Sequence, residues 1–85
     1  MRALTIYSRP GCHLCEEMKA IVHRVAGTHA NVSVEEIDIS ADARLEALYG
    51  LDIPVLLLDG RKVAKYRITE ETLTRALKGR EGTGP

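Results

Sequence analysis

Two cysteines three positions apart, at the point where the apolar pattern changes its period, constrain this fold more than any other feature. Cys12 and Cys15 are the only cysteines of the 85-residue chain and lie in the stretch RPGCHLC. Residues 2–8 before them alternate in polarity, which predicts a strand. From His13 the apolar residues recur at helical spacing, which predicts a helix that ends near Gly27. Cys12 is therefore expected at the junction of a strand and the first turn of a helix.

Beyond this helix the sequence predicts a second strand and a short second helix. The strand spans residues 31–40, and its apolar alternation reverses phase at residues 35–36. This reversal predicts either a bulge at residues 35–36 or a strand that starts there. The helix spans residues 40–50 and ends at Gly50. Its expected N-cap is Ser40 or Asp42, and its expected inward-facing residues are Leu45 and Leu48.

The last third of the chain predicts a hairpin and a third helix. An aliphatic strand at residues 55–58 precedes Asp59–Gly60, a pair typical of two-residue turns, so a strand at residues 62–66 should run antiparallel to it. Thr69 is the expected N-cap of a helix that ends at Gly79. The order βαβαββα requires parallel pairing of the first two strands. We therefore predict an α/β fold with a four-stranded mixed sheet and three helices, as one domain over residues 1–79 with a mobile tail at residues 80–85.

Composition excludes several classes of partner. Twelve Lys and Arg balance twelve Asp and Glu, and no block of like charge stands out, which argues against nucleic acid and anionic membrane surfaces. The longest aliphatic run, residues 55–58, is far too short to span a bilayer. The N-terminal residues before Cys12 lack an apolar signal core. We expect a cytoplasmic protein, in which a Cys-x-x-Cys pair indicates redox chemistry or metal binding rather than a structural disulfide.

The spacing of the thiols favours a redox pair. A thiol at a helix N-terminus lies beside free N–H groups and ionises more easily, and the thiolate is the form that attacks a disulfide. Arg9 and a protonated His13 would favour the thiolate of Cys12, whereas Glu16 would disfavour it. We expect a Cys12 pKa below the free value of ~8.5. Cys15, one turn deeper, could displace a disulfide formed at Cys12.

The pair has two other interpretations. Cys12, Cys15, His23 and His29 form the pattern C-x2-C-x7-H-x5-H, but on a continuous helix His23 lies ~12 Å beyond Cys15, too far for shared zinc ligation. A metal ion or iron–sulfur cluster shared between two chains through Cys12 is not excluded by this distance. The pair could also be two small buried residues, which is the weaker interpretation after Pro-Gly at a strand-to-helix junction.

The stretches IYSRPGCHLC and DIPVLLLDG, in a chain of this order, resemble the glutaredoxins of the thioredoxin fold. The resemblance covers almost the whole chain, through Leu77. It implies that Cys12 is the attacking cysteine and Cys15 the resolving one. It also implies that Arg9 meets a substrate carboxylate, and that Ile53–Pro54 is a cis bond beside which an incoming peptide pairs with the backbone of Ile53.

Departures from the glutaredoxin pattern bear on the electron donor. Glutaredoxins usually have a Gly-Gly pair just after the fourth strand, and this chain has Ala64 and Lys65 there, followed by Tyr66 and Arg67, which we expect to line the cleft. Between the cysteines stand His13 and Leu14 rather than the usual Pro-Tyr. These differences disfavour glutathione as the electron source, although short relatives keep the dithiol without the full glutathione site.

The sequence therefore predicts a monomeric thiol–disulfide oxidoreductase that reduces protein or small-molecule disulfides through Cys12 and Cys15. Its expected partners are proteins that contain disulfides, and its expected electron donor is a thioredoxin-type reductase or a small thiol. No bound cofactor and no metal are expected. Two rival functions remain: a metal or iron–sulfur module that uses Cys12, and a non-catalytic adaptor that keeps the fold.

Overall fold

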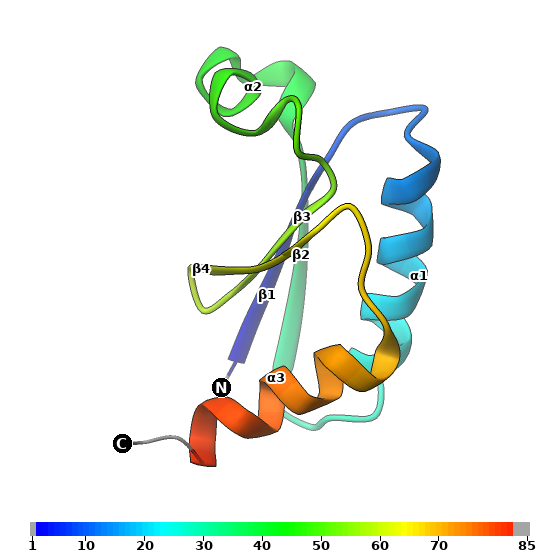
Figure 1. The fold of residues 1–85 in the computed structure, drawn as a ribbon, viewed down its shortest axis with the longest axis vertical. Helices are drawn as coiled ribbons and strands as arrows, with labels where there is room; N and C mark the ends of the chain where they lie inside the picture. Colours follow the sequence, from blue (N-terminus) through cyan, green and yellow to red (C-terminus); the bar gives the residue numbers. More distant parts are fainter. Residues whose placement is uncertain (1, 83–85) are drawn as a thin grey trace.

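The chain forms the predicted order of strands and helices around one mixed sheet. The computed structural model describes residues 2–82, with side chains through residue 78. The elements are β1 (Arg2–Ser8), α1 (His13–Ala26), β2 (Val32–Asp38), the 3-10 turn η1 (Ile39–Ala41), α2 (Ala43–Tyr49), β3 (Val55–Leu58), β4 (Arg61–Lys65) and α3 (Glu70–Gly82) (Figure 1). Among the described residues, no helix is long and apolar enough to cross a membrane.

The sheet has the mixed topology that the sequence predicts. Its strand order is β2-β1-β3-β4, with β1 parallel to β2 and antiparallel to β3. The β3–β4 pair is antiparallel, and its turn places Asp59 and Gly60 at φ 53° and 86°, which confirms the two-residue hairpin. Val55 at the start of β3 pairs with Tyr7 near the end of β1. The segment before β3 and the loop that carries the cysteines therefore lie at the same end of the sheet.

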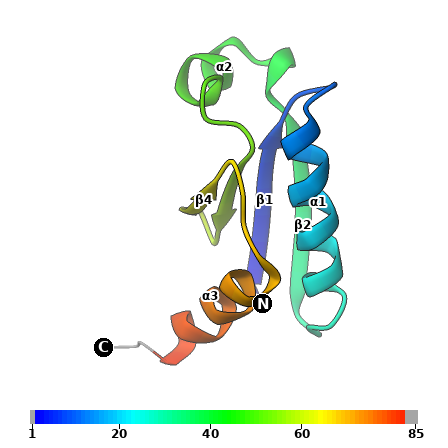
Figure 2. The same cartoon turned by 45° about the vertical axis from the view of Figure 1, so that its right-hand side comes forward.

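Helices α1 and α3 cover one face of this sheet, and the main core lies beneath them. Figure 2 shows α1 running alongside β1 and β2, with α3 across the far end of the sheet. The apolar side chains of the two helices and of the two central strands form one buried cluster, which consists of Leu4, Ile6, Met18, Val22, Val25, Leu56, Leu58, Ile68, Leu73 and Leu77. This packing fixes α1 against the sheet, and so fixes the position of its N-terminus.

Helix α2 lies at the end of the sheet where β1 leads into α1, and it packs loosely (Figures 1 and 2). The ring of Tyr49 stacks on that of Tyr7, with centroids 4.7 Å apart. No residue of α2 is buried, and Leu48 is 60% exposed. The prediction that Leu48 faces inward was wrong, because a seven-residue helix at the end of a sheet covers too little of it to bury both leucines.

The reversed phase within β2 reflects a charged residue on the face of the sheet that α1 covers. The β1–β2 register is continuous through Glu35 and Glu36, so the strand carries no bulge. Glu36 takes the face toward α1, where its carboxylate lies 2.5 Å from His23 Nε2 and 3.7 Å from Lys19 Nζ. The hydrogen bond with His23, followed by the charge of Lys19, lowers the pKa of Glu36 below its ordinary value. Because successive side chains of a strand point to opposite faces, Ile37 lies on the face away from α1.

Asp42 and Thr69 cap the second and third helices. Asp42 Oδ1 accepts hydrogen bonds from the backbone N–H groups of Arg44 and Leu45, at 2.9 and 3.1 Å. Ser40, the alternative cap, instead bonds to the carboxylate of Asp38. The N-cap expected at Thr69 is confirmed, since its Oγ1 accepts from the N–H of the residue three positions later at 3.0 Å.

The third helix does not end where the sequence predicts. The expected end at Gly79 was wrong, because α3 continues to Gly82. A glycine adopts helical backbone angles readily and costs a helix only about 1 kcal/mol relative to alanine, so by itself it is a weak stop. The first three residues of the predicted tail, 80–82, are thus helical, and residues 83–85 lie outside the described part of the chain.

Candidate active site

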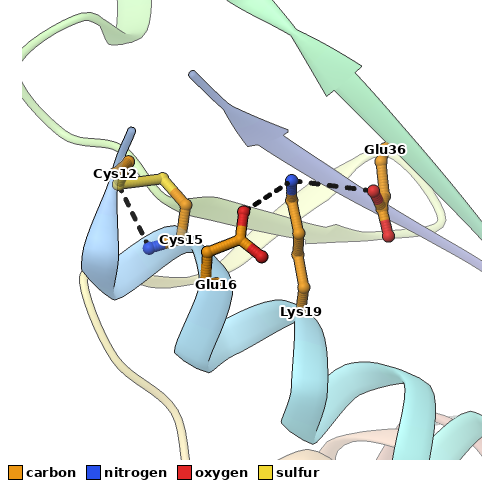
Figure 3. Close-up of a disulfide and its surroundings, with 5 residues drawn as sticks. All are labelled: Cys12, Cys15, Glu16, Lys19 and Glu36. Atoms are coloured by element: carbon orange, nitrogen blue, oxygen red, sulfur yellow. Dashed lines mark hydrogen bonds and ion pairs between the residues drawn. A yellow bond between two sulfur atoms is a disulfide. The ribbon is translucent and has the colours of Figure 1, made fainter. Parts of the chain in front are cut away.

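The two cysteines lie at the junction of β1 and α1, as the spacing predicts. Cys12 is the N-cap of α1, with extended backbone angles of φ −93° and ψ 111°. A disulfide joins it to Cys15, with the two Cα atoms 5.1 Å apart (Figure 3). Cys15 is completely buried and Cys12 is partly exposed. A molecule approaching from solvent therefore reaches the sulfur of Cys12 first.

One backbone N–H of the first helical turn contacts the sulfur of Cys12. The N–H of Cys15 donates a hydrogen bond to Cys12 Sγ at 3.1 Å. The N–H of Glu16 bonds to the carbonyl of Cys12 at 3.1 Å and closes the first turn. Gly11, at φ 78°, makes the sharp change of direction from β1 into the helix, a conformation that favours glycine. The loop thus holds the Cys12 sulfur against an N–H donor at the positive end of α1.

A chain of charges runs from this turn across to β2. Lys19 Nζ lies 3.4 Å from the carboxylate of Glu16 and 3.7 Å from that of Glu36 (Figure 3). The Glu16 side chain is 69% exposed, so solvent screens its charge strongly. The acidic residue next to Cys15 is therefore offset by both Lys19 and water, and it opposes a Cys12 thiolate only weakly.

Arg9, the predicted contact for a substrate carboxylate, is paired within the chain. Its Nη2 lies 2.6 and 2.7 Å from the two carboxylate oxygens of Glu46 in α2. Gly50 makes room for this pair, because a Cβ there would lie 2.8 Å from Glu46 Oε1 and 3.4 Å from Arg9 Nη2. Glu46 was not predicted from the sequence, since 37 positions separate it from Arg9 and no local pattern links the two. His13 is exposed at the first position of α1.

The segment before β3 is held by a residue after β4. Ile53–Pro54 is a cis peptide bond, as the resemblance implied. The N–H of Tyr66 donates to the carbonyl of Pro54 at 2.8 Å. The phenol of Tyr66 lies 3.1 Å from the carbonyl oxygen of Leu51 and 3.3 Å from Asp52 Oδ1. We refer to residues 51–54 as the cis-proline segment.

A groove of about 520 Å³ begins at Leu14, the residue before Cys15, and runs between α1 and the segment that links β4 to α3. Leu14 lines it from α1, and Tyr66 and Arg67 line it from the opposite side. Arg67 Nη1 lies 3.9 Å from Glu17 Oε1. Ala64 and Lys65, which stand where glutaredoxins usually carry the Gly-Gly pair, are the last two residues of β4 rather than the two just after it.

The histidines of the zinc-like pattern lie elsewhere. His23 pairs with Glu36, and His29 Nδ1 lies 2.9 Å from the carbonyl oxygen of Val25. Across the part of the chain that the structure describes, no group of three or more His, Cys, Asp or Glu side chains is placed to hold a metal ion. Within one chain, the pattern C-x2-C-x7-H-x5-H does not assemble a four-ligand site.

Comparisons with known proteins agree with this geometry. A Dictyostelium discoideum protein described as a glutaredoxin-like protein YDR286C homolog is 29% identical over 75 residues, which cover 82% of this chain and 69% of the relative. The X-ray structure of the structural-genomics target XcR50 from X. campestris is 31% identical with a TM-score of 0.75, and the match covers 89% of this chain and 96% of that one.

The fold extends to the thioredoxins. A mutant thioredoxin from Halobacterium salinarum NRC-1 matches with a TM-score of 0.68 at 23% identity, over 92% of this chain and 73% of that one, which shows the shared fold. The fold is thus the thioredoxin-like fold predicted from the sequence. The sequence model described as Glutaredoxin-like domain (DUF836) matches residues 3–78. The chain therefore belongs to this glutaredoxin-like family and carries a Cys-x-x-Cys pair of the kind used in thiol redox chemistry.

Proposed function

We propose that the protein is a thiol–disulfide oxidoreductase that reduces disulfides of proteins by dithiol exchange. One observation carries the proposal: a partly exposed sulfur at a helix N-terminus is bonded to a fully buried sulfur one turn later. This asymmetry suits a reaction in which one cysteine meets the substrate and the other acts only after the first has reacted. Membership of a glutaredoxin-like family supports the same chemistry.

In the proposed reaction the reduced protein supplies two electrons. The Cys12 thiolate attacks one sulfur of the substrate disulfide, and the other sulfur leaves as a thiolate that takes up a proton. Cys15 then loses its proton and attacks Cys12 Sγ, which releases the second substrate thiol. The net products are two substrate thiols and the Cys12–Cys15 disulfide. The N–H of Cys15 and the positive end of α1 favour the anionic sulfur at Cys12.

A protein substrate would lie along the cis-proline segment. No hydrogen bond to the backbone of Ile53 occurs within the described residues, so its polar groups are available to an extended peptide. Arg9 would contact a substrate carboxylate only by giving up Glu46. We therefore expect Arg9 to contribute less to the binding of a substrate carboxylate than its position near Cys12 in the sequence suggests.

We further propose that a thioredoxin-type reductase or a small thiol other than glutathione returns the electrons. Tyr66 and Arg67 place two long side chains directly after β4, and both line the groove next to Leu14. These side chains would hinder glutathione, a tripeptide, from approaching the backbone just after β4 closely. NADPH consumption with thioredoxin reductase, but not with glutathione and glutathione reductase, would support this donor, and efficient turnover with glutathione would contradict it.

Trapping tests the exchange itself. The variant Cys15→Ser should accumulate mixed disulfides with substrate proteins, because the group that resolves them is gone. The matched variant Cys12→Ser keeps one thiol and one serine at the same two positions, and it should trap almost nothing, because Cys15 is buried. Equal trapping by the two variants, or none by either, would contradict the proposal. Colour or stoichiometric metal in the freshly purified protein would instead favour the metal-binding function.

A further inference from the structure

The cis-proline segment ends at the fully buried Pro54, but its first three residues, 51–53, have few hydrogen bonds of their own. Leu51 is 94% exposed, and Ile53 has no backbone hydrogen bond among the described residues. The N–H of Asp52 bonds to the carbonyl of Tyr49 at 2.8 Å, which fixes only the start of the segment. The geometry of the residues between these two points therefore depends on contacts from another part of the chain.

Tyr66 supplies those contacts at both ends of the segment. Its backbone N–H bonds to the carbonyl of Pro54, and its phenol reaches the carbonyl of Leu51 and the carboxylate of Asp52. Lys65 supports this arrangement, since its Nζ lies 3.7 Å from Asp52 Oδ1 and 5.3 Å from the centre of the Tyr66 ring. One residue thus holds both ends of the cis-proline segment.

The backbone of Tyr66 adopts a conformation that a tyrosine rarely takes. Its φ is 70°, in the left-handed region that favours glycine, and the N–H of Arg67 bonds back to the carbonyl of Lys65 at 2.8 Å. A bulky side chain persists at such an angle only where its surroundings determine it, and such positions cluster at functional sites. In this protein the Tyr66 side chain, which makes the left-handed backbone angle unfavourable, is also the side chain that contacts Leu51 and Asp52.

We propose that Tyr66 is a positioning residue, which holds the cis-proline segment beside the Cys12–Cys15 pair and so sets the preference for protein disulfides over small ones. The inference rests on the proposed disulfide exchange. A protein substrate must pair with the segment, whereas a small disulfide needs only the sulfur of Cys12. Loosening the cis-proline segment therefore weakens the binding of protein disulfides more than the binding of small disulfides.

Single-turnover oxidation of the pre-reduced protein tests this proposal. Formation of the intramolecular disulfide is followed by mass with increasing insulin and, separately, with increasing 2-hydroxyethyl disulfide. Tyr66→Phe keeps the ring and removes the phenol hydroxyl. Tyr49→Phe is the matched control, because it removes a phenol hydroxyl from the neighbouring helix and keeps the ring that stacks on Tyr7.

For Tyr66→Phe, the ratio of the second-order rate constant for insulin to that for the small disulfide should fall about three- to tenfold, the range for one lost hydrogen bond. The fall should come from the half-saturating concentration of insulin and not from the limiting rate. Tyr66→Gly tolerates the backbone angle and loses the same contacts, so its ratio should fall at least as far. A wild-type ratio in both variants, or an equal fall in Tyr49→Phe, would overturn the proposal.

Amide hydrogen exchange separates this inference from the proposed function. In Tyr66→Phe, exchange at the amide of Asp52, whose N–H bonds to the carbonyl of Tyr49, should be faster by about the same three- to tenfold, because the phenol no longer holds the segment. Unchanged exchange would refute the positioning role even if the protein is an active oxidoreductase. A wild-type protein that neither substrate oxidises would refute the proposed function, and the exchange rates would still decide the role of Tyr66.

Discussion

The substitution Gly50→Ala should break the link between the cysteine loop and α2. The added Cβ would lie 2.6 Å from the backbone carbonyl oxygen of Glu46 and 2.8 Å from its carboxylate. The carboxylate can rotate away, but the carbonyl belongs to the helix, so the last turn of α2 must shift. That shift also moves Glu46 relative to Arg9.

The magnitude follows from three contributions. Steric overpacking costs about 1–3 kcal/mol. Loss of the ion pair adds at most about 1 kcal/mol, because the side chains of Arg9 and Glu46 are 38% and 35% exposed. Alanine restricts the unfolded chain more than glycine does, which stabilises the folded protein by about 0.4–1 kcal/mol. Together these contributions should lower the free energy of unfolding of Gly50→Ala by about 2 kcal/mol.

Gly27→Ala is the matched control for this prediction. Gly27 also follows the last turn of a helix with right-handed helical angles, but a Cβ there would lie 3.3 Å from the nearest atom, the carbonyl oxygen of His23. Its effect should stay within about 1 kcal/mol, since the gain in the unfolded state offsets a slight crowding. Urea unfolding of the oxidised protein measures both variants. Equal stabilities for Gly50→Ala and Gly27→Ala would refute the steric reasoning.

Two further predictions concern stability. Tyr66→Gly should be more stable to urea than Tyr66→Ala by about 1–2 kcal/mol, because both lose the same side chain but only alanine is strained at φ 70°; equal stabilities would argue against a left-handed residue. The pKa of Glu36 is lowered from 4.5 in the folded protein, mainly by its hydrogen bond with His23. Its contribution to stability is therefore complete above that value and is lost as the pH falls through the lowered pKa. The advantage of the wild type over Glu36→Gln should shrink with acid in this range, and a difference independent of pH would contradict the pairing.

The sequence predicts those parts of the fold that local rules determine. The strand and helix at the cysteines, the Asp59–Gly60 turn and the caps at Asp42 and Thr69 each depend on a few neighbouring residues, and each is found as predicted. Hydrophobic periodicity likewise identified β1, because its buried face alternates without interruption.

Features that depend on distant residues were not predictable in the same way. Within β2, Glu36 takes the helix-facing side because Lys19 and His23 of α1 pair with it there, and Arg9 is paired with a residue of α2. Leu48 carries the helical spacing of a buried residue, yet α2 lies where there is too little sheet to cover it. In each case the partner is far along the chain, and its position follows from packing rather than from local pattern.

The candidate site shows the same division. The placement of Cys12 and Cys15 followed from their spacing at a helix start, whereas the role of Tyr66 depends on a backbone angle that no sequence rule assigns to tyrosine. A glycine at position 66 would have indicated a left-handed backbone angle, and a tyrosine there gives no such indication.

The most direct test of the central claim is the pH dependence of alkylation of the reduced protein by iodoacetamide, with the modified residue located by mass spectrometry. Cys12 should react first, with a midpoint below the free cysteine value of ~8.5, while Cys15 stays protected by burial. A midpoint for Cys12 at or above that value, or modification of Cys15 before Cys12, would contradict an attacking thiolate at the start of α1.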